Sequence, residues 1–102
     1  MALDNDIQKR KIHIKFTEHA RLAMRGDDIT VDDVISALAG DVIEEYPDDK
    51  PFPSCLVCGK THDGKPLHVV CAMPKHVNML IIITVYIPSK DEWVESKKRR
   101  RK

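Results

Sequence analysis

The sequence of 102 residues has few aromatic residues, and its longest apolar run is far too short to span a bilayer. Its polar start, residues 1–11, lacks the apolar core of a signal peptide, so we expect a cytoplasmic protein without membrane contact. Three cysteines are an odd number, which argues against a secreted disulfide scaffold. A phosphate loop, a dinucleotide fingerprint and a nucleophile elbow are also absent, which argues against a kinase or a classical hydrolase.

The charges are unevenly distributed along the chain. The last six residues, 97–102, are all basic, whereas all 16 acidic residues precede them. The basic end predicts either a phosphate-binding tail or an ordinary solvated terminus. The remainder is acidic, which argues against a broad nucleic-acid surface. We therefore predict a flexible lead-in at 1–10, a single domain at 11–95 and a basic tail at 96–102.

The first half of the domain reads as a strand, two helices and a second strand. Alternating apolar residues predict a half-buried strand at 11–16, with Lys15 on its outer side. Thr17 and Thr30 have the side chains of helix N-caps, and Asp33 stands where a capping box needs it. These caps predict helices over 18–25 and 31–40. A strand at 41–46 leads into a linker at 47–53 that contains three prolines.

The second half predicts a three-stranded meander at 54–61, 66–73 and 78–87, with a tight turn at Asp63-Gly64. A capping box at Ser89 predicts a short C-terminal helix that carries Trp93. The expected fold is α+β: two N-terminal helices and a short C-terminal helix packed on one face of a twisted, mainly antiparallel sheet.

A two-residue turn would place Cys58 opposite Val69. Alternation then puts His68, Thr84 and Tyr86 on the face of the sheet away from the helices, whereas Leu56 and Cys58 face the core. A shift of one residue would reverse this assignment.

The spacing of Cys55 and Cys58, with His62 and His68 nearby, resembles half a zinc site. A second such cysteine pair is absent, and alternation in a strand points Cys55 and Cys58 to opposite faces. We therefore expect small buried thiols and neither a metal nor a cofactor. A disulfide between Cys58 and Cys71 is geometrically conceivable but disfavoured in a reducing cytoplasm.

Two histidines are candidates for acid–base chemistry. His19 lies in the first turn of the first helix, where it is either a general acid or base or simply a packed helix–sheet histidine. His68 and Tyr86 form a polar pair on an otherwise apolar sheet, or a satisfied core histidine and its partner. The cations that can hold phosphate are Arg21, Lys15, Arg25, Lys97, Lys98, Arg99 and Arg100.

Several blocks together resemble an uncharacterised bacterial and archaeal family, domain of unknown function number 4258, over about residues 14–95. They are residues 16–20, 33–34, 42–54, 64–70 and 83–86, of which YPDDKPFPS and PLHVV are the most specific. Members resemble small toxins of the RelE and BrnT kind in size and in order of elements, and they look like partners of a zinc-finger antitoxin.

The resemblance implies a metal-independent endoribonuclease that acts on RNA and is paired with an antitoxin. It matches His19 and His68 to the acid and the base, Arg21 to the cation that stabilises the phosphorane, and Tyr86 to a positioning role. The family commonly has arginines where this chain has Ala23 and Asp27. Two alternatives stay open: a non-catalytic protein-binding module that uses Leu80, Ile82 and Tyr86, and a small zinc-binding module.

Overall fold

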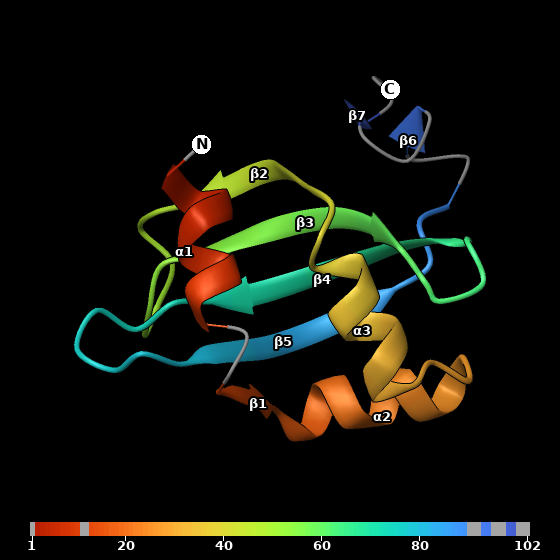
Figure 1. The fold of residues 1–102 in the computed structure, drawn as a ribbon, viewed down its shortest axis with the longest axis horizontal. Coiled ribbons are helices and arrows are strands. Elements are labelled where there is room, and N and C mark those ends of the chain that lie inside the picture. The colour runs from red at the N-terminus through yellow and green to blue at the C-terminus, as the bar shows by residue number, and fades with distance from the viewer. Residues whose placement is uncertain (1, 11–12, 90–92, 95–97, 100–102) are drawn as a thin grey trace.

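The computed structural model describes residues 2–10, 13–89, 93–94 and 98–99, and it has an α+β fold (Figure 1). The main sheet is mixed, because β1 runs parallel to β5 whereas the other neighbouring strands are antiparallel. Its spatial order is β1-β5-β4-β3-β2. The strands are β1 Ile14–Phe16, β2 Asp41–Tyr46, β3 Ser54–Lys60, β4 Pro66–Ala72 and β5 Leu80–Tyr86. The α+β class and these five strands are thus confirmed.

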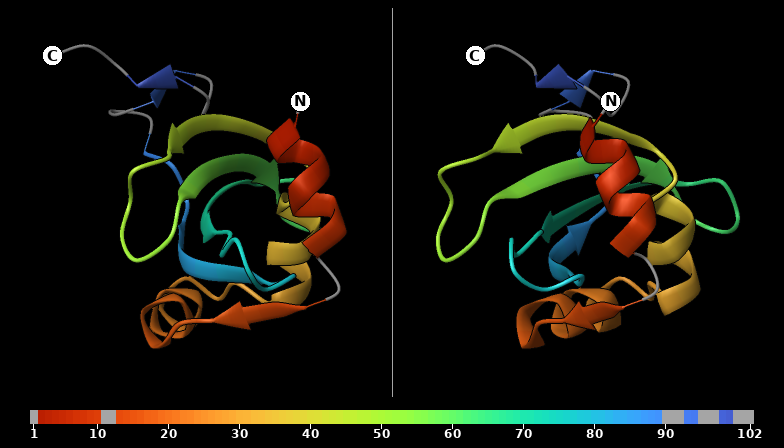
Figure 2. Two further views of the ribbon diagram at one scale, coloured as in Figure 1. Left: turned by 90° about the vertical axis from the view of Figure 1, so that its left-hand side faces the viewer. Right: turned by 60° about the vertical axis from the view of Figure 1, so that its left-hand side comes forward.

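Three helices contribute to one hydrophobic core on a single face of this sheet. They are α1 Ala2–Arg10, α2 Glu18–Gly26 and α3 Val31–Ala37. Side views show the sheet curving around α1 and α3 (Figure 2). The core joins Ile7, Met24 and Val34 of the helices to Val57 and Val69 of the sheet. Within the described ranges, no helix is both long enough and apolar enough to cross a membrane.

The structure has helix α1 where the sequence predicts a flexible lead-in. Ile7 is buried in the core, and the Arg10 guanidinium donates to three backbone carbonyl groups of the β4–β5 loop. The segment has too few apolar residues to show a helical stripe in the sequence. Tertiary contacts stabilise such a short helix, and these are invisible in local periodicity.

Both predicted N-caps are confirmed. Thr17 Oγ1 accepts from the Ala20 N–H at 3.0 Å and donates to the Ile83 carbonyl oxygen at 2.8 Å. Thr30 and Asp33 form a full capping box at the start of α3. The hydrogen bond that the Thr30 N–H donates to the Asp33 carboxylate lowers the pKa of Asp33 below its ordinary value. Each cap therefore satisfies backbone groups that the helix itself leaves unpaired.

Replacing Thr17 tests how much its hydroxyl contributes. We expect Thr17→Ala to lower the free energy of unfolding by about 1–2 kcal/mol, because the variant loses both the cap and the bond to β5. Urea unfolding followed by circular dichroism measures this difference. Thr17→Ser keeps the hydroxyl and should stay close to wild type. A Thr17→Ala protein as stable as Thr17→Ser would contradict the assignment.

The β3–β4 hairpin has a longer loop than a two-residue turn. The Thr61 N–H donates to the Lys65 carbonyl oxygen at 2.7 Å, and the Gly64 N–H donates to the Thr61 carbonyl oxygen at 3.0 Å. Gly64 has φ +87°, which glycine adopts without strain. The three residues 62–64 thus form the loop, a known alternative to the two-residue turn.

This loop shifts the strand pairing by one residue, so the predicted register is wrong. Cys58 pairs with His68, and Cys55 pairs with Cys71. Because a one-residue shift turns every side chain of a strand over, Cys55 and Val57 face the helices. Cys58 lies on the same face as His68, contrary to the prediction.

A second irregularity lies in β5. Val70 pairs with Thr84 whereas Cys71 pairs with Ile82, so Ile83 is an extra residue that interrupts the alternation. Strict alternation along this strand predicts Ile82 and Thr84 on one face, and this is wrong, since Ile82 is buried in the core. The face of the sheet opposite the helices, which we call the distal face, carries His68, Thr84 and Tyr86 as the sequence predicts.

The C-terminal segment differs from its predicted helix. Trp93–Val94 form a short strand, β6, that pairs with β7, Lys98–Arg99. The rest of the predicted helix, at 90–92 and 95–97, lies outside the described residues. A capping-box sequence is only a local signal, and at Trp93–Val94 strand pairing takes the place of the predicted helix.

Candidate functional sites

His68 and Tyr86 form the polar pair that the sequence predicts. They are opposite each other on β4 and β5, and His68 Nδ1 lies 3.2 Å from the Tyr86 hydroxyl oxygen. The two rings meet edge to face, with centroids 5.1 Å apart. His68 has 0% exposed surface. In this conformation the imidazole is a hydrogen-bonded interior group and is out of reach of a dissolved substrate.

His19 lies apart from this pair. It is exposed in the first turn of α2, and α2 packs on the helix-covered face of the sheet. Since His68 projects from the distal face, the sheet separates the two imidazoles. The structure thus does not bring together the two histidines that the resemblance matches to acid and base.

Two hollows adjoin on the outer side of α2. The larger, of about 550 Å³, and the smaller, of about 400 Å³, share Phe16, Arg21 and Arg25 in their linings. Arg21 and Arg25 are four residues apart, which places both guanidinium groups on one side of the helix. His19 is two residues from Arg21, about 200° around the helix, and therefore on the other side. Two of the predicted cations thus line the same hollows as an aromatic ring, whereas His19 of the same helix does not.

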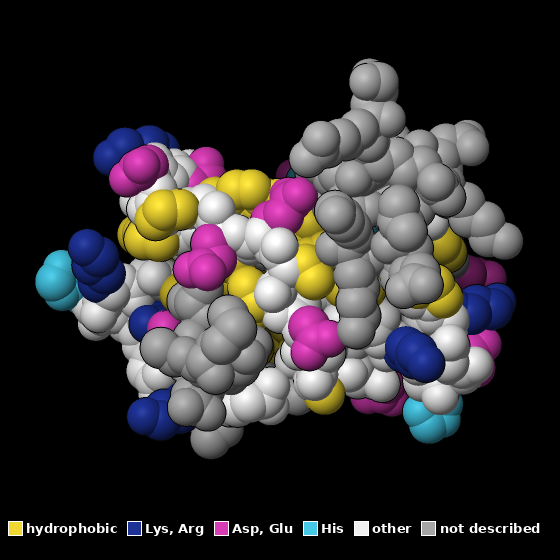
Figure 3. Space-filling view, turned by 90° about the horizontal axis from the view of Figure 1, so that it is seen from above, with side chains coloured by type: hydrophobic (Ala, Val, Ile, Leu, Met, Phe, Trp, Pro, Cys, Tyr) yellow, Lys and Arg dark blue, Asp and Glu magenta, His cyan; other side chains and the backbone are white. Residues whose placement is uncertain are grey.

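The other predicted cations are dispersed. Lys15 is exposed on β1, where it pairs with Ile81 and so projects toward the distal face. Lys98 and Arg99 form strand β7. Lys97 and Arg100 lie outside the described residues. Seen from the β2 side, basic side chains lie toward the ends of the molecule, and acidic ones lie both between and beside them (Figure 3). This side therefore offers no continuous basic surface among the described residues.

The cysteines lie on both faces of the sheet. The sulfur atoms of Cys55 and Cys71 are 3.7 Å apart in the core, whereas Cys58 is on the distal face. The hydrogen bond with Cys55 and the burial raise the pKa of the Cys71 thiol well above its ordinary value. Cys58 and Cys71 are thus on opposite faces, so the geometry considered for a disulfide between them is wrong. The described residues contain no cluster of three metal-ligating side chains.

The surface predicted for a protein-binding module is also absent in its expected form. Leu80 and Ile82 are both fully buried in the core, because the β5 bulge turns them toward the helices. Large exposed apolar side chains occur elsewhere, for example Leu22 of α2, which is 56% exposed, and Val31 of α3, which is 49% exposed.

One further pocket was not indicated by the sequence. It has a volume of about 630 Å³ and lies between the loop at 47–53 and the β4–β5 loop at 74–79. The prolines of the first loop were visible as a break in regular structure. The second wall, the β4–β5 loop, could not be predicted, because Arg10 of the distant helix α1 holds this loop by hydrogen bonds.

The comparison with protein families gives one match. The model of a domain of unknown function, DUF4258, matches residues 16–87. This chain belongs to the DUF4258 family. The matched region runs from the end of β1 to just beyond β5, and it includes His19, Arg21, His68 and Tyr86. No curated protein and no solved structure matches the chain. The DUF4258 assignment confirms the resemblance at the level of the family and carries no activity with it.

Proposed function

We propose that this DUF4258 protein is a toxin-like protein that binds RNA, and that the outer side of α2 is its phosphate-binding surface. The observation that carries the proposal is the shared lining of the two hollows by Phe16, Arg21 and Arg25. From β1 to β5 the order of elements is a strand and two helices followed by four strands, and this part of the chain supports the likeness to RelE and BrnT toxins. A likeness of this kind suggests a class of function rather than a mechanism.

The physical basis is the pairing of guanidinium groups with an aromatic ring. Arginine binds phosphate through planar, bidentate hydrogen bonds. Aromatic rings and arginines together are typical of surfaces that bind single-stranded nucleic acid. Glu18 and Asp28 also line these hollows, and they limit the positive potential. We therefore expect a few localised phosphate contacts rather than a broad basic surface.

A cleavage step, as in RelE-like endoribonucleases, needs an acid and a base near the bound phosphate. Of the two predicted histidines, His19 is exposed and His68 is buried. His19 is therefore the one that RNA can reach without rearrangement. We assign RNA binding to the two arginines. His19 lies on the other side of α2 from them, so its replacement tests whether this protein cleaves RNA at all or only binds it.

The salt dependence of RNA binding tests the arginines. Each phosphate contact to single-stranded RNA contributes about 0.7 to the slope of log K against log salt concentration. We expect the double variant Arg21→Ala/Arg25→Ala to bind more weakly and to have a slope smaller by about 1.4. Fluorescence anisotropy with a labelled single-stranded RNA, at several salt concentrations, measures both quantities.

The matched control is Lys60→Ala/Lys65→Ala, which removes the same charge from exposed positions at the β3–β4 hairpin. An equal loss of slope in both double variants would mean that only net charge matters, and would refute a localised site. The same incubations resolved on a gel report cleavage. RNA cut by wild type but not by His19→Ala assigns the chemistry to His19, whereas bound but uncut RNA identifies a binding protein.

Protein binding is a second candidate function, and one observation favours it. Leu22 and Val31 are large apolar side chains, about half exposed, and each lines one of the hollows. Exposed apolar groups near arginines are typical of protein interfaces. An antitoxin would be such a partner, and loss of its binding in Leu22→Ala with RNA binding retained would separate the two functions.

A further inference from the structure

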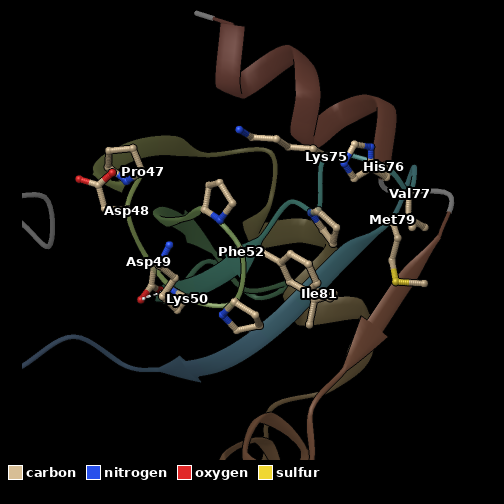
Figure 4. Close-up of a pocket in the computed structure, with 13 residues that line it drawn as sticks. Pro47, Asp48, Asp49, Lys50, Phe52, Lys75, His76, Val77, Met79 and Ile81 are labelled. Carbon is tan, nitrogen blue, oxygen red and sulfur yellow. Dashed lines mark hydrogen bonds between the residues drawn. The ribbon is translucent and has the colours of Figure 1, made fainter.

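The pocket between the two loops is the largest hollow described above, and its walls come from separate parts of the chain. One wall is the proline-rich loop at 47–53, and the other is the β4–β5 loop together with Met79 and Ile81. Figure 4 shows Phe52 toward the middle of the pocket, with Lys75 and His76 on one side and Asp48 and Lys50 on the other. A volume of about 630 Å³ lies within the usual range for small-molecule sites.

Hydrogen bonds hold the β4–β5 loop in place. Arg10 Nη1 lies 2.8 Å from the Pro74 carbonyl oxygen, 3.0 Å from that of Val77 and 2.8 Å from that of Met79. The guanidinium group is itself oriented by Asp6, whose carboxylate oxygen is 2.7 Å from Nε. This buried arginine thus fixes three carbonyl groups along one wall.

Two hydrogen bonds hold the proline-rich loop, one at Asp49 and one at Pro53. The Ser54 hydroxyl donates to Asp49 Oδ2 at 2.6 Å, and the Met73 N–H donates to the Pro53 carbonyl oxygen at 3.0 Å. Proline rings restrict the backbone between these points. Both walls are therefore preorganised, so a ligand need not order them on binding.

The lining combines a flat apolar surface with cations at its margin. Phe52 is 36% exposed, and the proline rings beside it are apolar. Lys50 and Lys75 are exposed residues of the lining. Lys15 adds a third ammonium group nearby, since it pairs with Ile81 and projects toward the same face. The carboxylates of Asp48 and Asp49 also line the pocket and offset the charge of the two lysines. An anion is therefore expected on the Lys75 side, across Phe52 from Asp48.

From this lining we infer that the pocket binds a nucleotide, with its base against Phe52 and its phosphate on the Lys75 side of the ring. An aromatic ring supplies a stacking platform for any base, and the ammonium groups supply charge complementarity for the phosphate. The same chemistry fits a free mononucleotide or one nucleotide of a single-stranded RNA. The inference rests on the proposed function, which it extends by naming a base-binding subsite distant in sequence from Arg21 and Arg25.

The test is calorimetric titration of wild type with AMP, UMP, adenosine and inorganic phosphate, and with a four-nucleotide single-stranded RNA. We expect AMP and UMP to bind more tightly than adenosine or phosphate. Phe52→Ala should weaken AMP binding at least fivefold, since stacking on an aromatic ring contributes about 1–3 kcal/mol per base. Lys75→Ala should weaken AMP binding and leave adenosine binding unchanged.

The matched control is Ile35→Ala on α3, which removes a side chain that is 39% exposed and lies outside the lining of this pocket. It should bind AMP as wild type does. Equal AMP affinity in wild type and Phe52→Ala, or inorganic phosphate binding as tightly as AMP, would overturn the inference. Tighter binding of the tetranucleotide than of AMP identifies single-stranded RNA as the source of the nucleotide, and the reverse identifies a free mononucleotide.

The outcomes also separate this inference from the proposed function. Phe52-dependent AMP binding by a protein that does not bind RNA supports the pocket and removes the RNA function. If RNA binding depends on Arg21 and Arg25, AMP does not bind, and Phe52→Ala binds RNA as tightly as wild type, the RNA function is supported and the nucleotide pocket is refuted.

Discussion

Gly59→Ala is expected to destabilise the protein by roughly 3 kcal/mol or more. A Cβ atom at this position would lie 2.6 Å from the carbonyl carbon of Ala37, and closer still to its carbonyl oxygen. Both groups in this overlap are backbone, so no rotation of a side chain relieves it. Gly40 meets the same part of β3, because a Cβ there would overlap Cys58. Helix α3 therefore sits on β3 at a distance that only glycine permits.

The cost follows from what α3 must do to make room. If the helix moves outward, Val34 and Leu38 lose contacts in the core, where each has at most 1% exposed surface. A loss of this size is a large part of the total stability of a small domain. Urea unfolding, together with the midpoint of thermal unfolding, measures it.

Gly26→Ala is the matched control, because it makes the same chemical change in open space. A Cβ at Gly26 would meet nothing within 4 Å, and the residue is the last one of α2. Alanine favours a helix over glycine, so this variant should be as stable as wild type or up to about 1 kcal/mol more stable. Similar stabilities for the two variants would show that α3 adapts to a side chain on β3, which would refute the close contact.

The two glycines also show what a sequence reveals of a fold and what it does not. Caps, strand positions and the α+β class follow from local chemistry, and the structure confirms them. The close approach of Gly40 to Gly59 is a contact between distant segments. The residues next to each glycine in the sequence give no indication of it. Helix α1 escapes prediction for a related reason, since its anchors, Ile7 and Arg10, act through distant partners.

The predicted register of the β3–β4 pair was wrong because the turn sequence is compatible with two loop lengths. Asp63-Gly64 is compatible with a two-residue turn and with the three-residue loop that the structure has. Because the loop is one residue longer, every side chain of β3 lies on the face opposite to the predicted one. The bulge at Ile83 does the same to the side chains of β5 that precede it. The pairing of His68 with Tyr86 was still predicted, because it depends on β4 and the end of β5 alone.

The candidate site was less predictable than the fold. A resemblance matches residues to roles one at a time, and it does not say whether they meet. Here the sheet lies between His19 and His68, and α2 turns His19 away from Arg21. What could be predicted were the residue types, such as the exposed arginines; what could not were the Phe52 pocket and its second wall, which depend on long-range hydrogen bonds.

His68→Ala gives the second large expected effect, a loss of roughly 2–4 kcal/mol in the free energy of unfolding. The side chain is fully buried and hydrogen-bonded to Tyr86, so its removal leaves a cavity and takes a partner from a partly buried hydroxyl. Tyr86→Phe keeps the ring and removes only the hydrogen bond, and it should cost about 1 kcal/mol. His19→Ala changes an exposed side chain and should stay within about 0.5 kcal/mol of wild type.

These three variants separate a structural from a catalytic role for His68. An interior histidine lowers stability when it is removed, and any fall in RNA cleavage then follows the folded fraction. A catalytic histidine lowers cleavage in protein that remains fully folded. We therefore expect urea midpoints and RNA cleavage to fall together in His68→Ala. A variant with wild-type stability and abolished cleavage would overturn the structural role, and would require the distal face to open around His68 during the reaction.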